Sequence, residues 1–423
     1  MAQPAATSQP LAATMAATNP AESDEECTVG VCRRDGLMER ERLLSPHLPF
    51  LGQWADCGFE VLLSSTQIYQ QNLRGGLSTH RHAGRYSGIY DLEMALDLEK
   101  VKLVPGGRMY MLAEGGWSEG IDEPSVGSLF GVNFNAIGDR AMDVAQLWYE
   151  QSLAEDRVRI RAGKIDLTGT FECQGCPVSF DGNTYANDAT LQFLNGALSN
   201  NPTIPFPDPG LGAIVYVEPV DGFYLSGGVA DADADFRETG FNTAFQGEDN
   251  YIAIFETGII PRLPSPNGPM IGAYRVGFWY DPQAKERFDG GTKRDDTGFY
   301  LSFDQMAYRE CSDEDDTQGL GLFARYGLTD GDVNEIRQFW SLGAQYQGLL
   351  PGRDSDVLGA GLASGCLSPQ AGFGESNETV MEVYYNIMIT PWLSLTPDLQ
   401  YVANPGGEGR DAVIGGVRLQ VSF

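Results

Sequence analysis

The last residues of the chain, RLQVSF, constrain the fold more than any other feature. Read backwards in steps of two, one face is apolar to the final residue: Phe423, Val421, Leu419 and Val417. The opposite face is polar: Ser422, Gln420 and Arg418. A period of two predicts a β-strand. Because chain ends usually fray, an aromatic last residue indicates that this strand is held in a sheet to its end.

The same alternation recurs along the chain. In GIYDLEMALDLEK, apolar side chains alternate with Asp91, Glu93, Asp97 and Glu99. A half-buried strand of a soluble sandwich alternates in the same way, but such a sandwich should also contain central strands of little polarity. Here most segments keep a polar face over about ten residues, the length of a tilted strand that crosses a bilayer. Only a closed barrel satisfies every strand edge in lipid.

The pattern predicts an all-β transmembrane antiparallel barrel of about sixteen strands, an even number as expected for closed bacterial barrels. The predicted strands span 57–70, 86–99, 106–116, 143–153, 158–168, 211–218, 222–230, 251–260, 270–280, 297–308, 318–326, 335–346, 356–364, 379–388, 393–403 and 411–423. When the connections are counted back from a periplasmic C-terminus, they fall into a short set and a long set. Short periplasmic turns at 154–157, 217–221 and 390–392 alternate with long external loops at 117–142, 169–210, 231–250, 281–296 and 365–378.

Composition agrees with one long folded unit. Of 423 residues, 42% are hydrophobic and 20% are charged, and no linker divides the chain. We expect residues 1–50 to be a periplasmic tail, disordered over 1–35 with a short helix at 37–46, and residues 51–423 to form the barrel. The Ala/Pro/Thr-rich start lacks the charged and apolar segments of a signal peptide, so its role stays open.

Charge and cysteines exclude several functions. A formal charge of −30 makes nucleic acid an unfavourable partner. Seven cysteines and three histidines supply no complete zinc site, so we expect no metal and no cofactor. Cys173 and Cys176 are spaced for a local disulfide. No Ser/His/Asp set stands out, and we expect no enzyme.

Alternation also predicts which side chains line the lumen. These pore-lining or substrate residues are Asp91, Glu93, Arg108, Tyr110, Trp148, Glu150, Arg161, Lys164, Arg275, Asp304, Glu382, Asp398 and Arg418, with Lys164 inward if a bulge lies near Gly163. For the constriction we favour Arg108, Glu93, Glu150 and Arg161, on sequential strands, with Trp148 and Tyr110 as stacking surface. The alternative is that these charges only solvate a wide lumen and pair along its wall.

Two further features belong to the barrel ends. Loop 169–210 is long enough to fold inward and narrow the pore, with the CQGC segment closing its base; the alternative is a surface lid. Trp392, Tyr401 and Phe423 are expected in the aromatic girdle at the membrane interface.

Several segments resemble one family. The stretch ETVMEVYYNIMITPWLSLTPDLQYVANPGG, followed by AVIGGVRLQVSF, resembles the C-terminus of OprB-type carbohydrate-selective porins, and WYEQSL, GLGLFARYG and GLLPGRDSDVLGAGLASG are similar to further family blocks. The resemblance covers about residues 51–423. The cysteines and the CQGC loop depart from the family.

The resemblance implies a sixteen-stranded outer-membrane channel for passive diffusion of sugars such as glucose. It also implies periplasmic termini and recognition of Phe423 by the barrel assembly machinery. A general or cation-preferring porin, or a plugged structural barrel, remains the alternative. Which sugar passes, and whether the chain forms a homotrimer, stays open.

Overall fold

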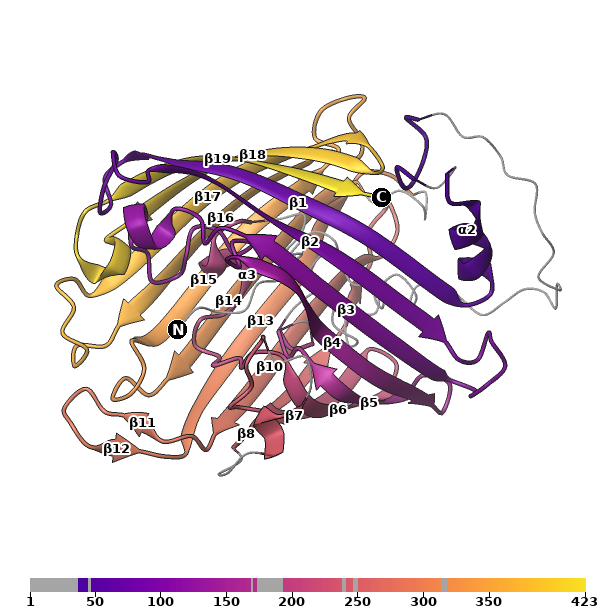
Figure 1. The fold of residues 1–423 in the computed structure, drawn as a ribbon, viewed down its shortest axis with the longest axis horizontal. Coiled ribbons are helices and arrows are strands. Elements are labelled where there is room, and N and C mark those ends of the chain that lie inside the picture. The colour runs from indigo at the N-terminus through magenta and orange to yellow at the C-terminus, as the bar shows by residue number, and fades with distance from the viewer. Residues whose placement is uncertain are drawn as a thin grey trace.

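The computed structural model describes residues 37–44, 47–168, 170–172, 193–237, 241–245, 250–312 and 318–423. Sixteen long strands among them form one closed antiparallel sheet (Figure 1). These strands are β1 (Phe59–Arg74), β2 (Gly84–Asp97), β3 (Gly107–Trp117), β4 (Arg140–Leu153), β5 (Val158–Ile165), β6 (Gly210–Val220), β7 (Phe223–Asp231), β8 (Tyr251–Ile259), β10 (Met270–Asp281), β13 (Asp296–Arg309), β14 (Gly319–Thr329), β15 (Ile336–Gln347), β16 (Val357–Leu367), β17 (Asn377–Thr390), β18 (Leu393–Ala403) and β19 (Ala412–Ser422).

Three two-residue strands accompany them. β9 (Arg262–Leu263) pairs with β10, while β11 (Lys285–Glu286) and β12 (Thr292–Lys293) form a hairpin beyond the end of the barrel (Figure 1). Within the described part of the chain, no helix is long and apolar enough to span a membrane.

The barrel closes where the two ends of the strand order meet. β1 pairs with β2 on one side and with β19 on the other, in a register that runs from Ser64 opposite Ser422 to Arg74 opposite Val413. The backbone N–H of Phe423 donates to the carbonyl of Leu63 at 2.8 Å. The prediction that the last strand is held to its end is therefore confirmed.

Each predicted strand overlaps one observed strand, and the span predicted for β18 is the observed one. The N-terminal helix lies later than predicted. Residues 37–44 form turns, and α2 spans Pro49–Asp56, where the proline occupies the first turn of the helix. The barrel consequently starts at Phe59, after this helix. Cys57, at its C-terminal end, is disulfide-bonded. Cys173 and Cys176 lie outside the described residues.

The two ends of the barrel differ in their connections. At the short-turn end, residues 154–157 join β4 to β5, residues 221–222 join β6 to β7 and residues 391–392 join β17 to β18. At the long-loop end, residues 118–139 form the β3–β4 loop and residues 166–209 form the β5–β6 loop. Trp392 lies at the short-turn end, near Phe423, whereas Tyr401 is close to the long-loop end of β18. One girdle therefore does not hold all three.

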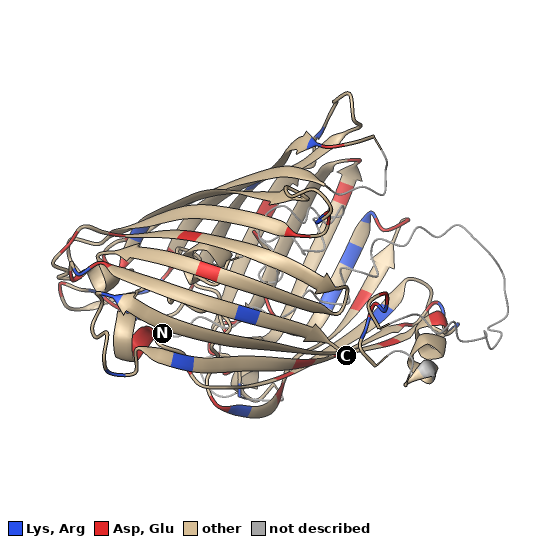
Figure 2. Cartoon of the chain, turned by 90° about the horizontal axis from the view of Figure 1, so that it is seen from above, with Lys and Arg blue, Asp and Glu red and all other residues tan. Residues whose placement is uncertain are grey.

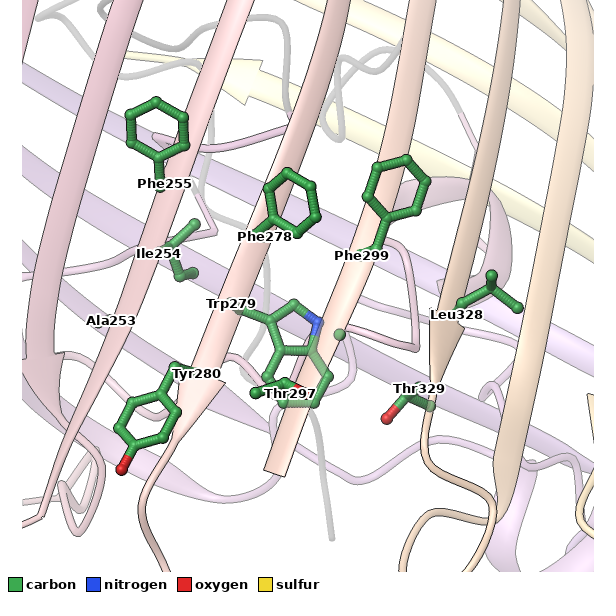
Figure 3. Close-up of a pocket in the computed structure, with 11 residues that line it drawn as sticks. Ala253, Ile254, Phe255, Phe278, Trp279, Tyr280, Thr297, Phe299, Leu328 and Thr329 are labelled. Carbon is green, nitrogen blue, oxygen red and sulfur yellow. The ribbon is translucent and has the colours of Figure 1, made fainter. Parts of the chain in front are cut away.

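The outer wall is largely apolar. Phe255, Phe278 and Phe299 lie side by side on β8, β10 and β13, with Leu328 on the next strand (Figure 3). Charged residues are instead placed part-way along the strands and in the connections (Figure 2). Several of those on the strands point inward: Arg275, Asp304 and Arg418 are at most 2% exposed. An apolar outside and a charged inside is the distribution of a barrel that crosses a membrane.

Two loops fill part of the lumen. Ile121, Val126 and Val132 of the β3–β4 loop, and Phe193 and Leu198 of the β5–β6 loop, are completely buried. They share one apolar cluster with inward residues of β14–β19, among them Phe323, Val380 and Ile414. The described residues of the β5–β6 loop in this cluster therefore pack against the inner wall, and the β3–β4 loop does so as well, which the sequence did not suggest.

Candidate functional site

Six side chains from four neighbouring strands form a charged cluster on the inner wall: Glu93, Arg108, Tyr110, Trp148, Glu150 and Arg161. In the strand register, Glu150 of β4 lies between Arg108 of β3 and Arg161 of β5. Residues directly opposite on neighbouring strands have Cβ atoms about 5 Å apart, so one carboxylate faces two guanidinium groups. The structure thus brings together the residues that alternation placed on the inner face.

The Glu150–Arg161 ion pair is the centre of this charged cluster. Arg161 donates to Glu150 Oε2 from Nη2 at 2.9 Å and from Nε at 3.1 Å. Glu150 is 4% exposed and Arg161 9%, while Arg108 is partly exposed. The pair is therefore buried, whereas Arg108, opposite Glu150 on the neighbouring strand, keeps part of its surface exposed.

An aromatic stack positions the guanidinium. Arg161 Cζ lies 3.8 Å from the centroid of Trp148, whose ring stacks on Tyr110 with a centroid distance of 5.0 Å and an interplanar angle of 26°. Tyr110 in turn donates to Glu93 Oε2 at 2.9 Å. Trp148 is 4% exposed, so the stack supports Arg161 and leaves little of the indole open to a solute.

The other predicted lumen residues lie in separate groups. Arg275 and Asp304 form an ion pair at 2.6 Å on β10 and β13. Asp91 lies opposite Glu114, nearer the long-loop end, and both are buried. Lys164 is also buried. The β4–β5 register is uninterrupted at Gly163, so the bulge that was the condition for this is absent, and Gly163 instead has a φ of 145°. Glu382, Asp398 and Arg418 lie on β17, β18 and β19, away from the charged cluster.

Glu382 and its neighbours hold the loops. Glu382 accepts hydrogen bonds from the backbone N–H groups of Leu194 at 2.6 Å and Asn195 at 2.9 Å. Gln70 and Gln400 both donate to the carbonyl of Val132, at 2.8 and 2.9 Å. These inward polar groups therefore satisfy loop backbone rather than facing a solute.

A second contact fixes the base of the β5–β6 loop. Glu172 accepts hydrogen bonds from Asn201, from the backbone N–H at 3.1 Å and from the side-chain amide at 3.0 Å. Its own N–H donates to Glu256 on β8 at 3.0 Å, and Glu256 also accepts from the hydroxyl groups of Tyr224 and Tyr300. Burial raises the pKa of Glu172 to about 7.

The sequence-based set of lumen residues left out two inward side chains, Arg159 on β5 and Glu256 on β8. Arg159 is 6% exposed, and its guanidinium lies 4.5 Å from the centroid of Tyr216. It precedes Arg161 by two positions, so alternation alone would have placed it inward. Glu256 also alternates inward, but its contact with Glu172 depends on the path of a loop and carries no local signal.

A closed sixteen-stranded barrel with an apolar outside and a charged inside that loops enter is typical of the porin class of membrane channels. Residues 81–423 match the family described as carbohydrate-selective porin, OprB family. The chain belongs to the OprB family. Membership of a porin family makes it a channel protein of the outer membrane.

Individual relatives are distant. Porin B of Pseudomonas aeruginosa is 22% identical over 427 residues, covering 88% of this chain and 91% of the relative. Porin AaxA of Chlamydia muridarum is 25% identical over 264 residues, 62% of this chain and 51% of that protein. The high-pH structure of Pseudomonas putida OprB has a TM-score of 0.77 at 19% identity and covers 92% of this chain and 100% of that chain. At 19% identity, this structural similarity supports the fold and nothing further.

Proposed function

We propose that this protein is a passive channel for monosaccharides such as glucose, and that the charged cluster is the part of the lumen that contacts the sugar. The observation that carries this proposal is the position of Glu150 between two arginines. Carboxylate oxygens accept hydrogen bonds and guanidinium groups donate them, so adjacent sugar hydroxyls find both kinds of partner within one cluster. No step consumes energy, and release requires that each contact be weak.

The proposal extends to orientation and assembly. The short-turn end, which carries both the C-terminus and α2, faces the periplasm, because barrels of this class have short periplasmic turns and longer external loops. Phe423, on the apolar face of β19, is the residue that the assembly machinery recognises.

Glu150→Gln tests the role of the charged cluster, with Glu286→Gln on the exposed β11–β12 hairpin as the matched control. Both variants lose one carboxylate, but only the first loses it beside the lumen. We expect Glu150→Gln to slow glucose-driven swelling of liposomes and Glu286→Gln to leave it unchanged. Equal swelling rates in both variants contradict the proposal for the cluster, even if the channel conducts.

A plugged structural barrel is the second candidate, since two loops are anchored in the lumen. Planar-bilayer conductance separates the two functions. Stepwise channels, together with faster swelling by monosaccharides than by amino acids of similar size, support the sugar channel. Stepwise channels without that preference indicate a general porin without sugar selectivity. A purified, folded protein without conductance supports the plugged barrel.

A further inference from the structure

Helix α2 has an apolar face that the barrel covers only in part. The helix packs against β1, beside the end of the barrel at which that strand starts (Figure 1). At about 100° per residue, its apolar side chains share one side: Phe50, Leu51, Trp54 and Ala55. Leu51 and Ala55 are partly buried, whereas Phe50 is 41% and Trp54 45% exposed. The half of the apolar face that carries the two rings is therefore open.

The two exposed rings lie on the lipid side of the barrel wall. Inward residues of β1 have even numbers, as Ser64 and Thr66 do, and both are at most 9% exposed. Phe59 has an odd number and therefore points outward. Its ring centroid lies 5.5 Å from that of Trp54, and the Phe50 ring lies 5.0 Å from Trp54 in an edge-to-face arrangement. The three rings thus continue the apolar outer wall beyond the start of β1.

Bonds on both sides of α2 hold this part of the chain at the rim of the barrel. Cys57, which caps the C-terminal end of the helix, is disulfide-bonded. Before the helix, the backbone N–H of Leu43 donates to the carbonyl of Ser422 at 3.0 Å. The Trp392 indole donates to the carbonyl of Leu37 at 2.9 Å. The helix is therefore held at the level where β1 and β18 start and β19 ends.

The chemistry of this helix suits the boundary between lipid tails and water. Helices that lie in a membrane interface carry Trp, Phe and Leu on one face and polar residues on the other. Tryptophan is enriched there because its indole joins a large apolar area to one N–H donor. On α2, the exposed Gln53 and Asp56 project from the side opposite the apolar residues. A soluble partner would have to displace the lipid next to Phe59 to reach the two rings.

We infer that α2 is an interfacial helix whose Phe50 and Trp54 insert into the lipid leaflet at the short-turn end of the barrel. The surface that they contact is the boundary between headgroups and acyl chains. The helix thereby holds the start of β1, the strand that closes the barrel with β19, at the membrane surface. Under the orientation proposed above, this leaflet is the periplasmic one. The inference rests on the continuity of the rings with the outer wall and is independent of the solute that passes.

Photo-cross-linking of the whole chain, reconstituted in vesicles of phosphatidylethanolamine and phosphatidylglycerol, tests the contact. The photoreactive residue p-benzoylphenylalanine replaces Trp54 in one protein and Phe278, on the apolar wall, in a second. In a third it replaces Phe245 of η2 (Thr243–Phe245), which is 72% exposed in the β7–β8 loop. We expect lipid adducts from positions 54 and 278 and none from 245, as identified by mass spectrometry. A lipid adduct from 278 without one from 54, equal adducts from 54 and 245, or a product of position 54 with another segment of the chain only, overturns the inference.

A second measurement uses a conservative variant and no photoreactive residue. Trp54→Phe keeps an aromatic ring and removes one of six tryptophans, so the emission of the wild type minus that of the variant isolates Trp54. Trp148→Phe, which removes a buried inward indole, is the control. In vesicles of brominated phosphatidylcholine, we expect the Trp54 difference to lose most of the intensity that it has in ordinary phosphatidylcholine, and the Trp148 difference to keep it. An unquenched Trp54 difference, or equal quenching of the two, overturns the inference.

Discussion

Two sides of the lumen use the same kind of residue for opposite purposes. On the inner wall of β2–β5, charges pair with one another between strands, as Glu150 does with Arg161 at 2.9 Å. On the inner wall of β17–β19 and β1, polar groups bind loop backbone, as Glu382 does with Leu194 and Asn195. We call the first the charged wall and the second the anchoring wall. The difference teaches that an inward charge in a barrel is not by itself a solute contact.

The anchoring wall leads to the largest expected effect. Glu382→Ala leaves two buried N–H groups of the β5–β6 loop without their acceptor, and each buried donor left unsatisfied costs about 1–3 kcal/mol. We expect the loop to leave its position, the single-channel conductance to rise and the sugar preference to fall. Glu286→Ala, outside the lumen, serves as the control. An unchanged conductance in Glu382→Ala would mean that the loop is held without this carboxylate.

The charged wall should respond differently. Glu150→Gln removes the negative charge between Arg108 and Arg161, so the local potential becomes more positive and anions should be favoured. We expect a shift of the zero-current potential toward anion selectivity in a salt gradient, with a single-channel conductance close to that of the wild type. If this variant instead enlarges the pore as Glu382→Ala is expected to do, the distinction between the two walls fails.

The base of the β5–β6 loop gives a pH dependence. Burial raises the pKa of Glu172 from 4.5 to about 7, so the folded protein binds this proton more tightly than the unfolded chain does. The resulting stabilisation is present at acid pH and is lost as pH rises through about 7. We expect the unfolding free energy in urea to fall less between pH 5 and pH 8 in Glu172→Gln than in the wild type. Parallel pH profiles would contradict this role.

The smallest effect is expected from the aromatic stack. Trp148→Phe keeps an aromatic face beneath Arg161 but loses the larger indole and its bond to Gln146 Oε1 at 3.1 Å. Cation–π contacts with tryptophan are the strongest of their kind and contribute about 2 kcal/mol when buried, of which a phenyl ring keeps a part. We expect a slightly lower melting temperature and a modest change in sugar permeation. A complete loss of permeation would show that the indole itself contacts the solute.

Most of the fold was predictable because its signal is local. Alternation placed the strands and assigned Arg161, Asp304 and Arg418 to the inside, where each is buried. The N-terminal helix was misplaced because the charged segment at 37–46 resembles a helix in composition, whereas Pro49 begins the observed one.

The site was predictable only in part. Arg108, Glu150 and Arg161 meet because consecutive antiparallel strands with short turns bring sequential inward residues side by side. The ring contacts of Trp148 depend on orientations that alternation does not specify. The anchoring role of Glu382 depends on Leu194 and Asn195, which are separated from it by 188 and 187 positions.

The sequence by itself determined the barrel and the direction of its side chains, because a period of two is a property of each strand and apolar residues must face lipid. Only the tertiary structure decided which inward charges remain beside the lumen and which are used by loops. The path of the β3–β4 and β5–β6 loops through the barrel depends on contacts between residues far apart in the chain, and no local pattern records them.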